Sequence, residues 1–133
     1  MGIGYVRILL DTHALLWWLA EDAFLSSRAR TAIAEPGNAV LVSVASAWEI
    51  AIKVRRGKLP GAADLVSDFA GSMLREGFSL VDITLEHALR AGMLPGPLKD
   101  PFDRMLIAQA QAENVPLLSN ESIFDGYGIR RLW

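Results

Sequence analysis

Residues 6–19, VRILLDTHALLWWL, decide how the chain folds. Val6 to Leu10 is a short, mainly apolar run without polar alternation, which predicts a strand buried on both faces of a parallel sheet. Asp11 ends this run abruptly, and the residues from Thr12 to Leu19 have helical character. A buried strand that leads directly into a helix indicates an α/β fold.

The same alternation of strands and helices continues to the end of the chain. Further strands are predicted over residues 39–43, 78–83 and 115–119, with a last strand over 129–133 at an edge of the sheet. Helices are predicted over 26–35, 46–56, 60–75, 84–92 and 101–113. In the helix over 46–56, we expect Trp48, Ile52 and Ala51 to face inward. This pattern predicts a three-layer α/β/α sandwich with a mainly parallel central sheet, in a single domain spanning residues 1–133.

The composition favours a packed protein that works without cysteine chemistry. Of the 133 residues 52% are hydrophobic and 21% charged, so we expect one compact core, with an apolar face available for a dimer. The sequence lacks both a signal peptide and a membrane-spanning run, which indicates a cytoplasmic protein with no membrane contact. Because there is no cysteine, a metal ion would bind carboxylate, imidazole or carbonyl groups.

The charge distribution gives only local support for nucleic-acid binding. A net charge of −2 argues against capture of nucleic acid by the field of the whole protein. Basic residues cluster in two places, at Lys53, Arg55, Arg56 and Lys58 and again at Arg130 and Arg131. They form either a basic rim around an acidic centre or ordinary solvated ends of helices and strands.

Acidic residues stand where strands end or helices begin, and each has an ordinary structural explanation. Asp11 follows a buried strand, where a carboxylate needs a partner, but it can also cap the next helix. Glu49 fits a capping box with Ser46. Asp103 lies in the first turn of a helix that Asp100 can cap.

The convergence of these acids is the argument for a catalytic site. Ligand sites of open α/β sheets lie outside the carboxyl ends of the strands, where Asp11 and the segment containing Glu121 belong. Mg²⁺ or Mn²⁺ would neutralise such a cluster, and an activated water would then hydrolyse a phosphodiester. The two histidines and the tryptophans are assigned to packing or hydrogen bonding, since no serine or cysteine nucleophile accompanies them.

The order of motifs resembles the PIN-domain family, and specifically its VapC toxins. The segments that carry the resemblance are LLDTHALLW (9–17), SVASAWEIAIK (43–53) with GKL (57–59), KDPFDRMLIAQA (99–110), and LLS (117–119) leading to Phe124 and Tyr127. The resemblance implies a PIN-like α/β/α fold and a Mg²⁺-dependent endoribonuclease. It also implies a homodimer and inhibition by a VapB-like antitoxin in a type II toxin-antitoxin pair.

The resemblance assigns the site residues position by position. Asp11, Glu49 and Asp103 match the catalytic acids of the family, with Asp11 and Asp103 as the principal metal ligands. The fourth position departs from the usual Thr-x-Asp or Thr-x-Asn, because this chain has Ser119-Asn120-Glu121. Additional candidate pocket residues are Glu121, Ser119, Asp100, Thr12 and Ser46.

Three functions remain open at this stage. The first is cleavage of structured RNA, which includes transfer RNA, by the toxin of a VapBC-type pair. The second is a binding module that keeps the PIN scaffold but is weakened in catalysis by the altered fourth acidic position. The third is a receiver-like domain with phosphate chemistry, which the lack of a Gly-rich phosphate loop disfavours.

Overall fold

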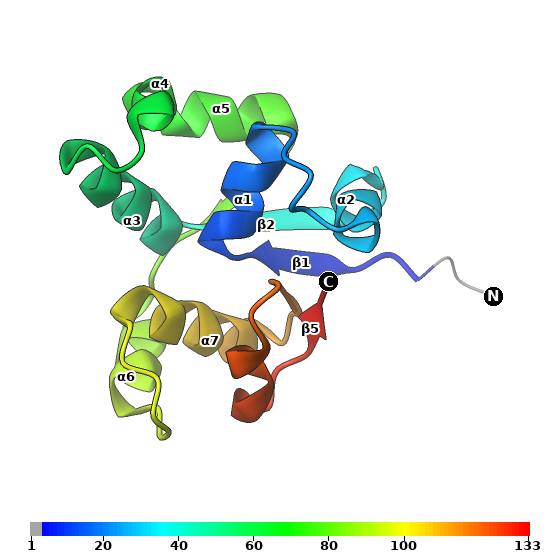
Figure 1. Cartoon of the computed structure of the whole chain (residues 1–133). Coiled ribbons are helices and arrows are strands. Elements are labelled where there is room, and N and C mark those ends of the chain that lie inside the picture. The colour runs from blue at the N-terminus through cyan, green and yellow to red at the C-terminus, as the bar shows by residue number, and fades with distance from the viewer. Residues whose placement is uncertain (1–3) are drawn as a thin grey trace.

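A central sheet of five parallel strands organises the protein, which a computed structural model describes for residues 4–133 (Figure 1). The strand order is β3-β2-β1-β4-β5. Every neighbouring pair is parallel, which confirms the α/β fold and makes the sheet parallel throughout. The strands are β1 (Arg7–Leu10), β2 (Ala39–Ser43), β3 (Ser79–Val81), β4 (Leu117–Leu118) and β5 (Arg131–Leu132).

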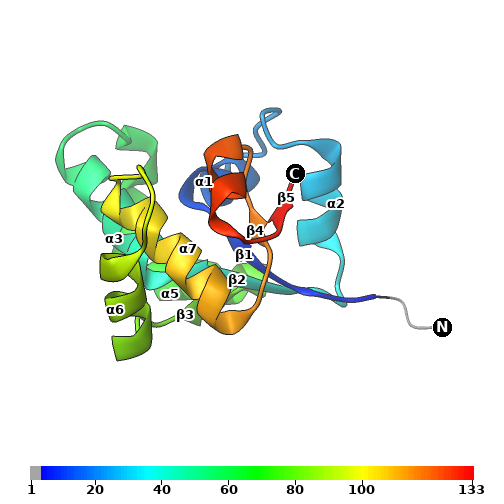
Figure 2. The same ribbon diagram turned by 90° about the horizontal axis from the view of Figure 1, so that it is seen from below.

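Helices cover both faces of this sheet and complete the predicted three layers. Figures 1 and 2 show α1, α2, α4 and α5 on one face, α6, α7 and η2 on the other, and α3 beside the sheet. The α-helices are α1 (Thr12–Leu19), α2 (Ser27–Ala34), α3 (Val44–Arg55), α4 (Ala63–Ser67), α5 (Phe69–Glu76), α6 (Leu85–Met93) and α7 (Pro101–Glu113). Two 3₁₀ helices are η1 (Pro60–Ala62) and η2 (Ser122–Tyr127).

The unbroken apolar run of β1 is explained by burial on both of its faces. Ile8 and Leu10 belong to the core under α1, α2 and α5. Leu9 points the other way and belongs to the core formed with Leu106 and Ile107 of α7. Because successive strand residues face opposite sides, both helical layers need apolar residues from the same four-residue strand.

Two predicted helices differ from the observed ones. The helix predicted over 60–75 is three pieces, η1, α4 and α5. Asp68 separates the last two, because it takes φ −144° and ψ 61° and its carboxylate caps α5 by accepting from the Gly71 N–H. The helix predicted from Ser46 begins at Val44 instead, with Ser43 as its cap. Polar capping residues therefore set these boundaries more than the hydrophobic period does.

The inward face of α3 was predicted incorrectly. Ile50 is the fully buried side chain, Ile52 and Ala51 are only partly buried, and Trp48 is 61% exposed. Trp17, Trp18 and Trp133 pack against the core, as expected. Trp48 instead contacts Phe102 edge-on, with the ring centroids 5.1 Å apart.

His87 is a structural residue of the α6–α7 layer. It is buried, its Nδ1 accepts from the Thr84 N–H, and its Nε2 lies 3.1 Å from a Glu113 carboxylate oxygen. Thr84 completes a capping box by accepting from the His87 N–H. This confirms packing and hydrogen bonding as the role of His87.

Within residues 4–133, no helix has the length and apolar character needed to cross a membrane.

Candidate active site

Asp11 lies at the carboxyl end of β1 and is almost completely buried, with 5% of its surface exposed. Its Oδ1 accepts from the Ala14 N–H at 2.7 Å, so the carboxylate caps α1. Burial raises the pKa of Asp11 above its usual range, while hydrogen bonds from the Ser119 side chain and the Ala14 backbone act in the opposite direction. A buried carboxylate that accepts few hydrogen bonds is stabilised either by taking up a proton or by binding a cation.

Thr12 and Ser46 connect the first helix of the site to α3. The Thr12 hydroxyl donates to Ser46 Oγ at 2.9 Å, and both side chains are buried. Ser46 lies inside α3 rather than at its cap, so the proposed capping box with Glu49 is wrong. Glu49 instead forms an ion pair with Lys53, one helical turn further on, at 3.0 Å.

The N-terminus of α7 brings in two further carboxylates. Asp100 caps the helix by accepting from the backbone N–H groups of Phe102 and Asp103, at 2.9 and 3.0 Å. Asp103 is half-buried beside it. Burial, reinforced by the negative charges of Asp100, Glu121, Glu49 and Asp11, raises the pKa of Asp103 to about 7.

Acids from four separate segments contribute to the raised pKa of Asp103, which indicates that they lie near one another. Their sequence positions range from the end of β1 to the segment after β4. Like charges in a partly buried place repel, and each neighbouring carboxylate therefore favours the protonated form of Asp103. This is the convergence that the parallel topology predicts, since strand ends of one polarity share one edge of the sheet.

Glu121 follows β4 and contributes a negative charge to the acidic cluster. Its backbone N–H donates to Ser119 Oγ at 3.0 Å, and its Oε1 lies 3.9 Å from Nδ1 of His13. The His13 ring stacks on Trp17, with the ring centroids 5.5 Å apart. His13 thus belongs to the rim of the site, which the sequence alone did not indicate, because nothing in its spacing linked it to Glu121.

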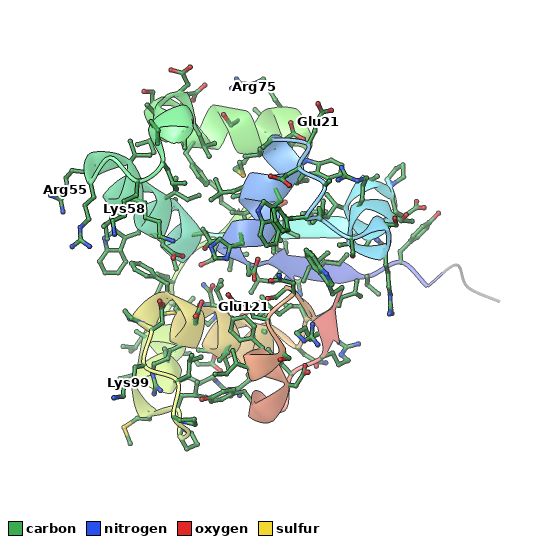
Figure 3. The ribbon with its side chains drawn as sticks, viewed as in Figure 1. Glu21, Arg55, Lys58, Arg75, Lys99 and Glu121 are labelled. Atoms are coloured by element: carbon green, nitrogen blue, oxygen red, sulfur yellow. The ribbon has the colours of Figure 1, made fainter. Side chains whose placement is uncertain are left out.

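The basic residues lie to one side of the acids. In Figure 3, Glu121 is near the middle of the molecule, whereas Arg55, Lys58 and Lys99 are at one edge. Arg131 forms an ion pair with Asp125 at 2.8 Å and also donates to the Ser119 carbonyl. Of the group at 53–58, Lys53 contacts the acidic cluster through Glu49, whereas Arg131 reaches it through the Ser119 carbonyl.

The donor set suits a hard cation with an open coordination sphere. Across residues 4–133, no three acidic, histidine or cysteine side chains converge tightly enough to enclose an ion by themselves. Mg²⁺ is commonly held by one or two carboxylates, with water and substrate phosphate as the other ligands. Asp11 and Asp103 provide such carboxylates, and the excess negative charge around them is what a cation would relieve.

Comparison of the sequence with known families identifies the class of protein. The model of the PIN domain family matches residues 8–129, a range that includes all the acids described above. The chain belongs to the PIN-domain family.

Individual relatives narrow this class to the VapC group. Ribonuclease VapC22 of Mycobacterium tuberculosis is 34% identical over 104 residues, covering 77% of this chain and 78% of that protein. VapBC2 from Rickettsia felis, solved bound to a DNA fragment from its promoter, has the same fold, with a TM-score of 0.69. The two chains are 16% identical, and the match covers 96% of this chain and 99% of that one. VapC20 of M. tuberculosis, described as a toxin that cleaves the sarcin-ricin loop, gives a TM-score of 0.60 at 16% identity, covering 92% and 95%.

Proposed function

We propose that the chain is a divalent-metal-dependent endoribonuclease that hydrolyses RNA phosphodiester bonds, using Mg²⁺ with Mn²⁺ as a substitute. The observation that carries this proposal is the gathering of carboxylates around Asp103, whose pKa is raised to about 7 by burial and, in addition, by the charges of Asp100, Glu121, Glu49 and Asp11. Protein folds seldom keep such a costly cluster without a use for it. Similarity to a protein named Ribonuclease VapC22 supports RNA as the substrate of this chemistry.

Asp11 and Asp103 are the proposed metal ligands. Asp11 is held in place by the Ala14 N–H, and this bond uses only Oδ1. Asp103 is fixed in the first turn of α7 by the cap that Asp100 makes. A divalent ion bound there would act as a Lewis acid on the phosphoryl group and lower the pKa of water.

The remaining residues hold these two carboxylates and the substrate in place. Glu49 is kept next to the cluster by Lys53 and can accept a proton from the attacking water at its free carboxylate oxygen. Ser119 donates toward Asp11 and accepts from the Glu121 N–H, so one hydroxyl links two acids. Thr12 and Ser46 fix the distance between α1 and α3 through their hydrogen bond.

The proposed biological setting is the toxin of a VapBC-type toxin-antitoxin pair. The structure from R. felis contains VapB and VapC together, which favours a VapB-like antitoxin for this chain. The substrate class is structured RNA, including transfer RNA, recognised through shape because the net charge is −2. The functional unit is one PIN-like domain over residues 1–133, assembled as a homodimer.

The test is cleavage of total RNA by the purified chain with Mg²⁺, with Mn²⁺ and with a chelator. Wild type is expected to produce discrete fragments that disappear with chelator and in Asp11→Asn and Asp103→Asn. Asp64→Asn is the matched control, since Asp64 is exposed on α4 away from the acids. The same cuts from Asp11→Asn would refute the proposal.

A measurement independent of catalysis tests the metal site. Thermal unfolding is measured at increasing Mg²⁺ concentrations. Bound Mg²⁺ should raise the Tm of wild type and of Asp64→Asn, but not that of Asp103→Asn. Ion-dependent stabilisation without any RNA cleavage would instead support the weakened binding module, and phosphorylation of the chain by a small phosphoryl donor would support the receiver-like alternative.

A further inference from the structure

We infer that an aromatic strip beside the acidic cluster stacks unpaired bases of the RNA substrate. The strip consists of three rings, those of His13, Trp17 and Phe24. The His13 ring is stacked on Trp17, with the centroids 5.5 Å apart and an angle of 20° between the ring planes. Trp17 is stacked on Phe24 in the same way, at 5.7 Å and 26°. The inference rests on the proposed function, because it states how the same site holds its substrate.

The strip begins at the acidic cluster. Nδ1 of His13 lies 3.9 Å from Oε1 of Glu121, and the His13 side chain is 48% exposed. Figures 1 and 3 show α1 leading from the neighbourhood of Glu121 toward Glu21, at the start of the α1–α2 loop. A base stacked on the strip would therefore belong to a nucleotide close to the phosphodiester bond that reaches the acids.

The outer end of the strip is exposed although its backbone is held in place. Phe24 is 73% exposed, so only part of its ring is covered by Trp17. Its backbone N–H donates to Oδ1 of Asp22 at 2.9 Å. The Asp22 carbonyl in turn accepts from the Arg30 guanidinium at 3.0 Å and from the N–H of the buried Leu25 at 3.2 Å. An aromatic ring that a fixed loop keeps in water indicates a contact surface.

The middle ring is fixed by the core of the protein. Trp17 is partly buried and packs against the core below α1. Trp133 supports it from the C-terminal strand segment, with the ring centroids 5.8 Å apart and the planes tilted by 60°. The three rings are thus arranged before any ligand arrives, which reduces the entropy that binding would cost.

The flat geometry of the strip favours a nucleobase as its ligand. Every base has a planar face, and unpaired bases of RNA loops stack on aromatic and histidine side chains. Stacking also compensates for the weak attraction of RNA to a chain with a net charge of −2. The bases of a duplex are already stacked on one another, so the strip is expected to select single-stranded positions.

A groove beside the strip has room for the rest of the nucleotide. His13 and Trp17 line this groove together with Lys58 and Leu65, and its volume is about 490 Å³. Sites for small molecules have volumes of roughly 300–1,000 Å³. Lys58 is exposed and brings a positive charge to the groove, where a phosphate of the RNA chain would be attracted.

The test measures the affinity for a labelled RNA hairpin with an unpaired loop and for the paired duplex of its stem, by fluorescence anisotropy. Ca²⁺ replaces Mg²⁺ to neutralise the acids, and a gel confirms that the RNA stays intact. Wild type is expected to prefer the hairpin. Phe24→Ala should weaken hairpin binding about tenfold, the order expected for one stacked base, without changing duplex binding. Phe24→Trp and the matched control Leu74→Ala, which removes an exposed side chain of α5, should bind as wild type does.

Circular dichroism confirms that each variant is folded. Because stacking releases no counterions, the loss in Phe24→Ala should be the same at about 50 and about 200 mM salt. A wild type without preference for the hairpin, or a Phe24→Ala variant that binds the hairpin as tightly as wild type, would overturn the inference and leave a protein as the partner of the strip. Hairpin binding without any Mg²⁺-dependent cleavage would refute the proposed function alone, and cleavage with unchanged affinity in Phe24→Ala would refute the strip alone.

Discussion

Replacing Asp103 by asparagine should stabilise the metal-free protein while it removes cleavage. The pKa of this carboxyl is raised from 3.8 to about 7 by burial and by the surrounding acids. At about pH 8 the group is ionised in both the folded and the unfolded chain, and its charge is unfavourable only in the folded one. Asparagine has nearly the same shape without the charge, so the folded state is relieved of that repulsion.

The magnitude follows from the shift and from the exposure of the group. A shift of roughly 3 pKa units corresponds to about 4 kcal/mol for a fully desolvated group. Asp103 is only half-buried, so screening by solvent reduces the expected gain to about 1–2 kcal/mol. For a chain of this size, that gain raises the Tm by roughly 4–8 °C.

The pH dependence distinguishes this cause from a general improvement in packing. A carboxyl whose folded pKa is raised contributes its full stability below the unfolded value of 3.8, and that contribution is lost as the pH rises to about 7. The difference in Tm between Asp103→Asn and wild type should therefore grow from about pH 4 to pH 7 and stay constant above. A constant difference at every pH, or a less stable Asp103→Asn at about pH 8, would refute the reasoning; Asp64→Asn should show neither effect.

Three further predictions concern the ion, the cap and a structural arginine. Mg²⁺ should raise the Tm of wild type more at about pH 8 than at about pH 5, because protons compete with the ion at Asp103. By calorimetry, Asp11→Ala should be less stable than Asp11→Asn by about 1 kcal/mol, since only asparagine retains the cap of α1, while both variants should lose cleavage. Arg104→Met should lose about 3 kcal/mol in urea unfolding, because its guanidinium donates to the carbonyl oxygens of Ala91, Gly92, Leu94 and Leu98; Arg130→Met, with one bond of 3.5 Å, should be nearly neutral.

The parallel α/β architecture was predictable because it depends on patterns that are local in sequence. The apolar run ending at Leu10 must be buried on two sides, and a helix begins directly after it. Pro101 and Asp100 likewise fix the start of α7 by their own chemistry. The number of strands and their approximate positions therefore follow from the sequence, although the ladders are shorter than the apolar segments that contain them.

The details of α3 were not predictable in the same way. The sequence around the start of α3 is compatible with several first residues and several inward faces of the helix, because it contains Val44, Ala45, Ser46 and Trp48. The hydrophobic period alone predicts that the tryptophan is buried. In the structure Ser46 faces inward, where it accepts from Thr12, and Trp48 faces outward. A hydrogen bond between residues 34 positions apart leaves no local trace in the sequence.

Capping and metal binding, which compete as explanations of Asp11 in the sequence, are compatible in the structure. A carboxylate has two oxygens, and the cap of α1 engages Oδ1 through the Ala14 N–H. The same hydrogen bond fixes the direction of the second oxygen, so the cap also orients the group for a ligand. At α7 the two tasks are divided between neighbours, because Asp100 caps the helix and Asp103 is left among the other acids. The helix starts at this edge of the sheet therefore position the proposed catalytic acids, and their capping role supports the candidate site.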